Sequence, residues 1–448
     1  MYEEILRKLD PSYARRLTEE MIGIPSVTGD EEAMALYVKE KLDSYGFETE
    51  LNYVQPKRPN LHATLKGSKL GKRLDYNAHS DTVPAGEGWA TDPYKAVVKD
   101  GKIFGRGACD MKSGIACTLE AFRAIADSGH EFAGELSTSL VFDQEATDIG
   151  AWAMMEDSRW RSLDAIVLTY SYCGDESKPI PLGLTGKVLY DIKVKGKAAH
   201  GFRPHLGVNA VEDAAKIVAN LDRLQLKLHN EFGKGTYCTL KFEGGYQIYS
   251  VVVPASARFE VNRLLVPGET IQYALDDMRH LVDSLNLKSE VEIAVKPPEY
   301  EPYTCTMDEP IMKTLDSVYR EVMSRAPLYE HAYGITNANI FQGEQGIPCV
   351  HIGPQRGEAH GANEYVKLEW LPPVSKIYAL IAARYLSYSL SMGSTFIVLY
   401  WRGLKHGFQR PTRSGLLRCR RLPSLARLAN NYRRYVHADA PRYCREDA

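Results

Sequence analysis

The feature that most constrains the fold is an alternation of short apolar runs with helical patterns over the first 170 residues. Runs typical of strands lie at 61–65, 73–78, 136–142 and 165–169. Apolar residues at helical spacing predict helices within 11–45, at 113–127 and near 150–155. Strands that alternate with helices favour an α/β layer with a largely parallel sheet, in which ligand groups gather at the carboxyl ends of the strands.

The segment 24–30 separates two helices within 11–45, and either Thr28 or Asp30 is placed to cap the second of them. From about residue 184 the pattern changes to strands at 186–194 and 259–265 and helices at 207–221 and 270–285, which is typical of a compact α+β insert. A helix, a strand and a last helix then follow, at 311–323, 348–352 and 374–386.

A chain of 448 residues is too long for one core, and we expect two or three domains. We predict a discontinuous domain from 1–185 and 297–388, with a smaller α+β domain, 186–296, inserted into it. The formal charge of −2 gives no reason to expect nucleic acid or a membrane as a partner. Eight scattered cysteines without CxxC pairs indicate neither a thiolate zinc site nor a disulfide framework, and no secretory signal or bilayer-length apolar run is visible. The cytoplasm is the predicted location.

His79 and Asp81 follow a strand-like run, and Asp110 ends a Gly-rich turn thirty residues later. Alternate side chains of a strand point the same way, so this His-x-Asp pair is a candidate metal corner that Asp110 can complete. The alternative is a strand-ending histidine with loop acids that only interact with solvent. The spacing alone leaves both interpretations open.

A longer set of motifs resembles the M20 family of metallopeptidases and deacylases. The resemblance runs from about residue 15 to 387. In chain order the set is His79-x-Asp81, Gly105-Arg106-Gly107 before Asp110-Met111-Lys112, the pair 144–145, Gly196-Lys197-Ala198-Ala199-His200 before Gly207-Val208-Asn209-Ala210, and Ala359-His360-x-x-Asn363-Glu364.

The resemblance implies a zinc-peptidase-like catalytic domain, a dimerisation or lid domain, and a site for two zinc ions bridged by an aspartate. Cobalt and manganese are the alternatives, because these metals share nitrogen and carboxylate ligands. His79 and Asp110 would hold one ion, and Asp110, Glu145 and His360 the other. Asp81 would orient His79.

The same resemblance implies a homodimer, because His200 would reach the partner subunit's site and stabilise an oxyanion there. It also implies substrate contacts in a few loops. The positions that we predict to bind substrate are Asn209, Gly353 and Asn363.

The departures from the family pattern bear most on function. Gln144 stands where a glutamate general base is usual, and Tyr170 stands where an acidic ligand of the first metal is usual. An amide cannot take a proton from water, and a neutral phenol is a poor zinc ligand. Asn337 replaces a usual aspartate, and Leu264, next to Arg263, stands where an arginine is usual.

We therefore expect one tightly held ion and a second that is weak or absent. The predicted function is slow hydrolysis of an amide bond in a small peptide or N-acyl amino acid. A non-catalytic relative that binds a small ligand or a partner is the alternative.

The segment 389–448 carries eleven arginines against a single lysine, Lys405, and lies beyond the resemblance. It can be interpreted as a basic arm that binds nucleic acid or as an extension unrelated to the fold, such as out-of-frame translation. We favour the second interpretation.

Overall fold

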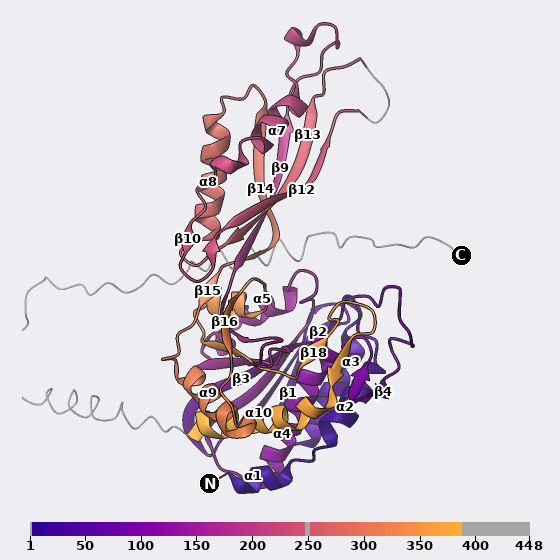
Figure 1. The fold of residues 1–448 in the computed structure, drawn as a ribbon, viewed down its shortest axis with the longest axis vertical. Helices are drawn as coiled ribbons and strands as arrows, with labels where there is room; N and C mark the ends of the chain where they lie inside the picture. The colour runs from indigo at the N-terminus through magenta and orange to yellow at the C-terminus, as the bar shows by residue number, and fades with distance from the viewer. Residues whose placement is uncertain (1, 247–250, 388–448) are drawn as a thin grey trace, which may run out of the picture.

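The structure is a computed structural model that describes residues 2–246 and 251–387. Its centre is a six-stranded sheet (Figure 1), whose strands, in spatial order, are β1 (Glu48–Gln55), β2 (Arg58–Lys66), β6 (Ala133–Val141), β3 (Lys69–His79), β7 (Ala165–Leu168) and β17 (Cys349–His351). The β6, β3, β7 and β17 strands run parallel to one another, whereas β1 and β2 pair antiparallel. The predicted mixed, mostly parallel α/β sheet is confirmed.

Helices cover this sheet, and its central strands β3 and β7 are buried on both faces. The helices of this part are α1 (Glu3–Lys8), α2 (Tyr13–Ile22), α3 (Glu32–Ser44), α4 (Ser113–Ser128), α5 (Ile149–Glu156), α6 (Ser158–Arg161), α9 (Pro310–Met323) and α10 (Leu371–Ser387). The α4 and α10 helices pack against each other and against β3, and the Tyr76 hydroxyl of β3 donates to the Tyr378 carbonyl of α10.

The predicted cap of α3 is wrong. The helix begins after Glu31 with no side-chain cap, and Thr28 instead donates its hydroxyl to Asp81 at 2.8 Å. A buried carboxylate needs hydrogen-bond donors more than a solvated helix end does, because water can satisfy the N–H groups at that end.

The insert is a separate antiparallel sheet (Figure 1, upper part) whose strands, in spatial order, are β12 (Thr236–Gly244), β13 (Ser256–Leu265), β9 (Gly186–Lys195) and β14 (Glu290–Tyr300). Alternate residues of β9 are apolar and buried, from Val188 to Val194, and pack under α7 (Ala210–Val218) and α8 (Ile271–Ser284). This core is a cluster distinct from that of the main sheet. The α+β character of the insert is confirmed, and its limits at 186 and 296 stay a prediction.

Two small sheets connect distant loops. One joins β4 (Val97–Lys99), β5 (Lys102–Phe104), β19 (Tyr365–Lys367) and β18 (Arg356–Gly357), and the other joins β15 (Tyr303–Thr304), β8 (Ile180–Leu184) and β16 (Tyr329–Ala332). A two-stranded hairpin of β10 (Leu228–His229) and β11 (Gly233–Lys234) completes the strands. Because β5 pairs with β19, the Gly-rich turn after β5 lies against the loop that carries His360.

The structure bears on three further predictions. In its described part, all six cysteines are free and no helix is long and apolar enough to cross a membrane. The arginine-rich segment 389–448 lies outside the described residues.

Candidate metal centre

The predicted metal ligands begin at the carboxyl edge of the main sheet. His79 is the last residue of β3, and the parallel neighbours β6 and β7 end at the same edge. The His79 ring is fully buried, with Nδ1 3.0 Å from the Asp81 carbonyl and 3.4 Å from its carboxylate. With the proton on Nδ1, the lone pair of Nε2 faces Asp110, whose Oδ1 lies 3.2 Å away. This is the orientation that a metal-ligating histidine requires.

Asp81 holds more than the histidine. Its carboxylate, fully buried, accepts the backbone N–H groups of Gln144 at 3.1 Å and Glu145 at 3.0 Å, besides the Thr28 hydroxyl. Asp81 therefore fixes the loop after β6 relative to His79. The sequence predicts the link to His79 but gives no sign of the link to the loop.

Asp110 stands between the Gly-rich turn and α4, and a buried glutamate holds its backbone. Glu364 accepts the N–H of Asp110 at 3.1 Å and that of Cys109 at 2.9 Å, and it forms a 2.6 Å ion pair with the buried Arg106. Gly107 has φ = 80°, and a Cβ there would meet Lys112 and Thr82 at 2.9 Å. The turn is thereby fixed so that the Asp110 carboxylate faces the cavity.

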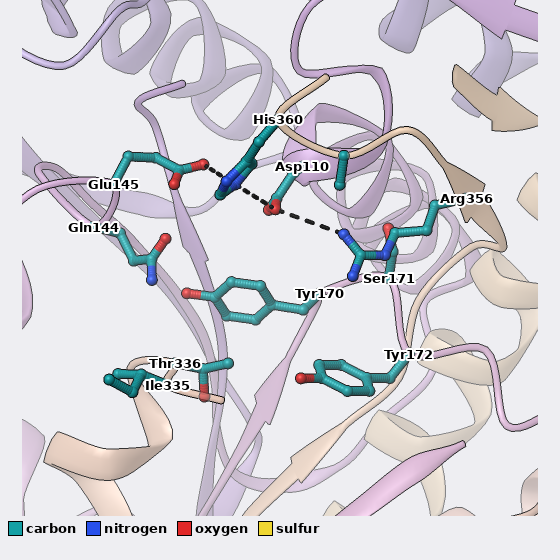
Figure 2. Close-up of a pocket in the computed structure, with 11 residues that line it drawn as sticks. Asp110, Gln144, Glu145, Tyr170, Ser171, Tyr172, Ile335, Thr336, Arg356 and His360 are labelled. Atoms are coloured by element: carbon teal, nitrogen blue, oxygen red, sulfur yellow. Dashed lines mark ion pairs between the residues drawn. The ribbon is translucent and has the colours of Figure 1, made fainter. Parts of the chain in front are cut away.

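His360 completes the cluster from the loop between β18 and β19. Its Nε2 lies 3.3 Å from Asp110 Oδ2 and 3.1 Å from Glu145 Oε1 (Figure 2). The close approach of these two carboxylates raises the pKa of His360 to about 10. Asp110 is thus shared, with one oxygen toward His79 and the other toward His360.

The donor set suits a divalent ion. Ligand atoms of His79, Asp110 and Glu145 all lie within 4.8 Å of one another. Glu145 Oε1 is buried and makes no hydrogen bond of good geometry in the described part of the chain, although His360 Nε2 is near. Burial raises the pKa of Glu145 and its contact with His360 opposes that rise. Imidazole nitrogens and carboxylate oxygens, brought together at a cavity, fit zinc, cobalt or manganese.

Tyr170 and Gln144 line the same cavity, which has a volume of about 290 Å³. Tyr170 lies two residues beyond β7, with its ring centre 5.4 Å from that of His79. Burial, and then the charges of Asp148 and Asp110, raise the pKa of the Tyr170 phenol well above its usual value, so it is neutral. In Figure 2 the Gln144 amide and the Tyr170 ring point into the same cavity as the carboxylates.

The remaining predicted residues do not line this cavity in a single chain. His200 is exposed in the insert, and Asn209 caps α7 by accepting the N–H groups of Val211 and Glu212. Asn363 accepts the Ala90 N–H at 2.8 Å and so holds the neighbouring loop. Gly353 packs on the backbone at Tyr170, where a Cβ would approach a carbonyl oxygen to 2.3 Å.

Two other positions that differ from the family pattern, 337 and 264, lie at or beside residues with buried side-chain partners. Asn337 is buried and donates to Asn77 Oδ1 at 3.0 Å. Arg263, next to Leu264, is fully buried in ion pairs with Glu269 and Asp277.

Sequence reasoning missed several residues that line the cavity. These are Ser171, Tyr172, Ile335, Thr336, Arg356 and Ala359. Their nearness in sequence to predicted site residues could have indicated two of them. Arg356 lies four residues before His360, and Tyr172 lies two residues after Tyr170.

Comparisons with known proteins agree with this geometry. Residues 76–384 match the family described as peptidase family M20/M25/M40. The chain is 28% identical over 371 residues to a succinyl-diaminopimelate desuccinylase of Sulfurovum sp. (strain NBC37-1), covering 81% of this chain and 95% of the relative. It is 27% identical over 390 residues to the uncharacterized protein YgeY of Escherichia coli (strain K12), covering 83% and 94%.

Solved structures share the fold. Aminopeptidase PepT from Bacillus cereus ATCC 10987 superimposes with a TM-score of 0.70 at 21% identity, over 84% of this chain and 99% of that one. The Bacillus subtilis protein YXEP, described as a dinuclear metal binding peptidase, gives 0.65 at 17% identity, over 84% and 99%. Together with the matched motifs, these findings show that the chain belongs to the M20/M25/M40 family of peptidases.

Proposed function

We propose that this chain is a metal-dependent hydrolase of the amide bond in a small peptide or an N-acyl amino acid, with one firmly held divalent ion. The observation that carries the proposal is the approach of three possible ligands at a cavity. Carboxylate oxygens of Asp110 and Glu145 both lie within 3.3 Å of His360 Nε2. Three protein ligands with an open position are typical of catalytic zinc. Family membership supports the amide as the scissile bond.

The ion would supply Lewis-acid polarisation of the carbonyl and make water acidic enough to ionise near neutral pH. The chain's own residues position the other groups. Asp81 would hold His79 and the 144–145 loop in place. The Gln144 amide can donate a hydrogen bond into the cavity but cannot accept a proton, so the step that a general base would assist goes unassisted. Loss of a general base typically costs about a hundred- to ten-thousandfold in rate, and slow turnover follows.

His200 and Asn209 enter this proposal only through a second copy of the chain. Neither lines the cavity of its own subunit, and both lie in the insert. A homodimer in which His200 reaches the partner's cavity would supply an oxyanion donor there from the second copy.

The test is hydrolysis of a panel of N-acetyl amino acids and dipeptides by the zinc-loaded chain, followed as released amine. We expect slow turnover that a chelator abolishes and added zinc restores. An Asp110→Asn control should be inactive. Turnover that persists in the control or with the chelator would contradict the proposal.

The combined presence of Gln144 and Tyr170 favours a second candidate, a non-catalytic relative that keeps one ion for binding a ligand or a partner. The double variant Gln144→Glu, Tyr170→Glu separates the two. Activity in both the wild type and the double variant supports the hydrolase. Activity in the double variant alone supports the non-catalytic relative.

A further inference from the structure

A buried acid close to a candidate ligand has no role in the site as described so far. Asp148 is fully buried and immediately precedes α5, three residues after Glu145. Its φ of 57° lies in the left-handed region, which favours glycine. Its Oδ1 makes no hydrogen bond within the described part of the chain, and burial raises the pKa of this carboxyl well above its ordinary value. The backbone conformation and the desolvated acid both cost free energy, which points to a role for this residue.

Asp148 has a hydrogen-bond partner from a distant part of the chain. The hydroxyl of Tyr300 donates to Asp148 Oδ2. Tyr300 is the last residue of β14, so it stands where the chain returns from the insert to the main sheet. The hydrogen bond therefore joins the crossover from the insert to the segment that leads into α5.

The segment 143–148, which carries Glu145, is a closed turn. The Asp143 carbonyl accepts the N–H groups of the last three residues of this segment, at 3.2, 3.0 and 2.8 Å. Asp143 itself forms a 2.6 Å ion pair with the half-buried Arg58. The turn therefore has one anchor at its start, Asp143, and one at its end, Asp148, with Glu145 between them.

The Tyr300 side of this hydrogen bond is also held in place. Tyr300 pairs with β9, and a Cβ at the neighbouring Gly186 would approach the Tyr300 carbonyl oxygen to 2.4 Å. The carbonyl of the next residue, Glu301, accepts the side-chain amide of Asn339 at 2.9 Å. The Tyr300 hydroxyl is therefore presented to Asp148 from a fixed backbone.

We propose that Asp148 is a positioning residue of the metal centre, which together with Tyr300 fixes the end of segment 143–148 and thereby the place of Glu145 in the ligand set. Asp81 holds the backbone of Glu145 from one side, and Asp148 holds the segment from the other. The crossover from the insert thus raises the affinity for the ion without touching it. The inference rests on the proposed function, because it assumes one firmly held ion with Glu145 among its ligands.

The test measures zinc affinity, in competition with a chromophoric chelator, for the wild type and for Tyr300→Phe. This variant keeps the ring and removes the hydroxyl that donates to Asp148, so we expect zinc to bind about ten- to a hundredfold more weakly, as on loss of other residues that support a ligand. Tyr303→Phe is the matched control, because it removes from β15 a buried tyrosine hydroxyl that makes no hydrogen bond among the described residues. The control should bind zinc as the wild type does. Equal affinity in Tyr300→Phe and the wild type would overturn the inference.

Two substitutions of Asp148 separate positioning from a merely structural role. Asp148→Asn keeps an oxygen that can accept the Tyr300 hydroxyl, so it should keep most of the wild-type affinity. Asp148→Gly removes the acceptor but suits the positive φ, so we expect weaker zinc binding without a lower melting temperature of the metal-free chain. A merely structural residue would lower zinc affinity and melting temperature together, and that result would contradict positioning.

A double variant tests whether Tyr300 and Asp148 act together. Tyr300→Phe combined with Asp148→Gly should bind zinc no more weakly than either single variant, because each removes the same hydrogen bond. Losses that add would show that the two residues act separately, against the inference.

The outcomes distinguish this inference from the proposed function. If zinc affinity depends on Tyr300 and Asp148 but no amide is hydrolysed, the positioning role stands and the proposed hydrolase fails. If amides are hydrolysed and zinc affinity is the same in all the variants, the hydrolase stands and the positioning role fails. A wild type that binds no zinc would contradict both.

Discussion

The two halves of the cavity differ in what they offer an ion, although they share Asp110. One half holds two carboxylates and an imidazole. In it, His360 Nε2 lies 3.3 Å from Asp110 Oδ2 and 3.1 Å from Glu145 Oε1. On the other half, Asp110 Oδ1 and His79 face each other at 3.2 Å, and the nearby ring is Tyr170. In the proposed site, the first half would supply three protein ligands, as an ordinary catalytic zinc site does, and the second would supply two.

The comparison indicates how a single residue, Tyr170, would unbalance the proposed paired site without disturbing its framework. The carboxylate Asp81, the ion pair of Arg106 with Glu364, and the Gly-rich turn hold both halves equally. In the proposed site, Tyr170 distinguishes the second half, because a phenol whose pKa is raised by burial stays neutral and would be a poor metal ligand. The expected result is unequal affinity for two ions rather than a collapsed site.

Removal of the shared ligand should have the largest effect. Asp110→Asn keeps the shape of the side chain but withdraws a charge from both halves, so we expect metal-dependent hydrolysis to fall to background and bound metal to fall close to zero. Metal content by mass spectrometry and amine release measure the two effects. Retention of one tight ion would show that the halves do not share Asp110.

A base at position 144 should have the next largest effect. Gln144→Glu adds a proton acceptor beside the cavity, and we expect the rate to rise by about a hundred- to ten-thousandfold. The rise should require bound zinc, and it should be absent in Gln144→Met, which fills the space without a base. An unchanged rate in Gln144→Glu would mean that the wild-type site is not limited by its missing base.

A carboxylate at position 170 should make the halves alike. Tyr170→Glu gives His79 and Asp110 a third ligand, and we expect metal content to rise from one to two ions per chain. Tyr172→Glu is the matched control, since it places a carboxylate in the same cavity on the Arg356 side. Two ions in both variants would show that added charge, rather than position, is responsible.

The smallest effect concerns the metal-free chain and its pH dependence. The nearby carboxylates of Asp110 and Glu145 raise the pKa of His360 to about 10, from an ordinary value near 6.5. A raised histidine pKa stabilises the fold fully below the unfolded value and loses that contribution as the pH rises toward 10. The melting temperature of the chelated wild type should therefore fall relative to His360→Gln between pH 6.5 and 10. Parallel profiles would place His360 away from the carboxylates.

Much of the main fold could be predicted from the sequence because short, largely buried strand-like runs alternate with clear helical patterns. The runs that became β3, β6 and β7 stand out because both of their faces are buried. By contrast, β12 and β14 were missed, since their residues are largely exposed or half-buried and lack that contrast. The pairing between β5 and β19 could not be predicted either, because no local sequence pattern indicates that two short strands far apart in the chain will pair.

The candidate ligands were found in the sequence because they stand in recognisable motifs at strand ends and loop corners. Their mutual approach depends on Glu364, which holds the Asp110 turn, and on Asp81, which holds the 144–145 loop. Arg356 was missed because a single basic residue in a loop resembles a solvated one until the cavity is seen. The roles of His200 and Asn209 stay predictions, since neither faces the cavity of its own chain.

The imbalance between the two halves is tested most directly by the number of ions in the wild-type chain. The chain should be purified without chelator, dialysed against metal-free buffer, and then titrated with zinc in competition with a chromophoric chelator. If Tyr170 gives no ligand, we expect one tight ion per chain and a second binding step that is at least about a hundredfold weaker. Loss of a residue that only supports a ligand already weakens metal affinity by about ten- to a hundredfold. Two ions of similar affinity would contradict the unequal halves.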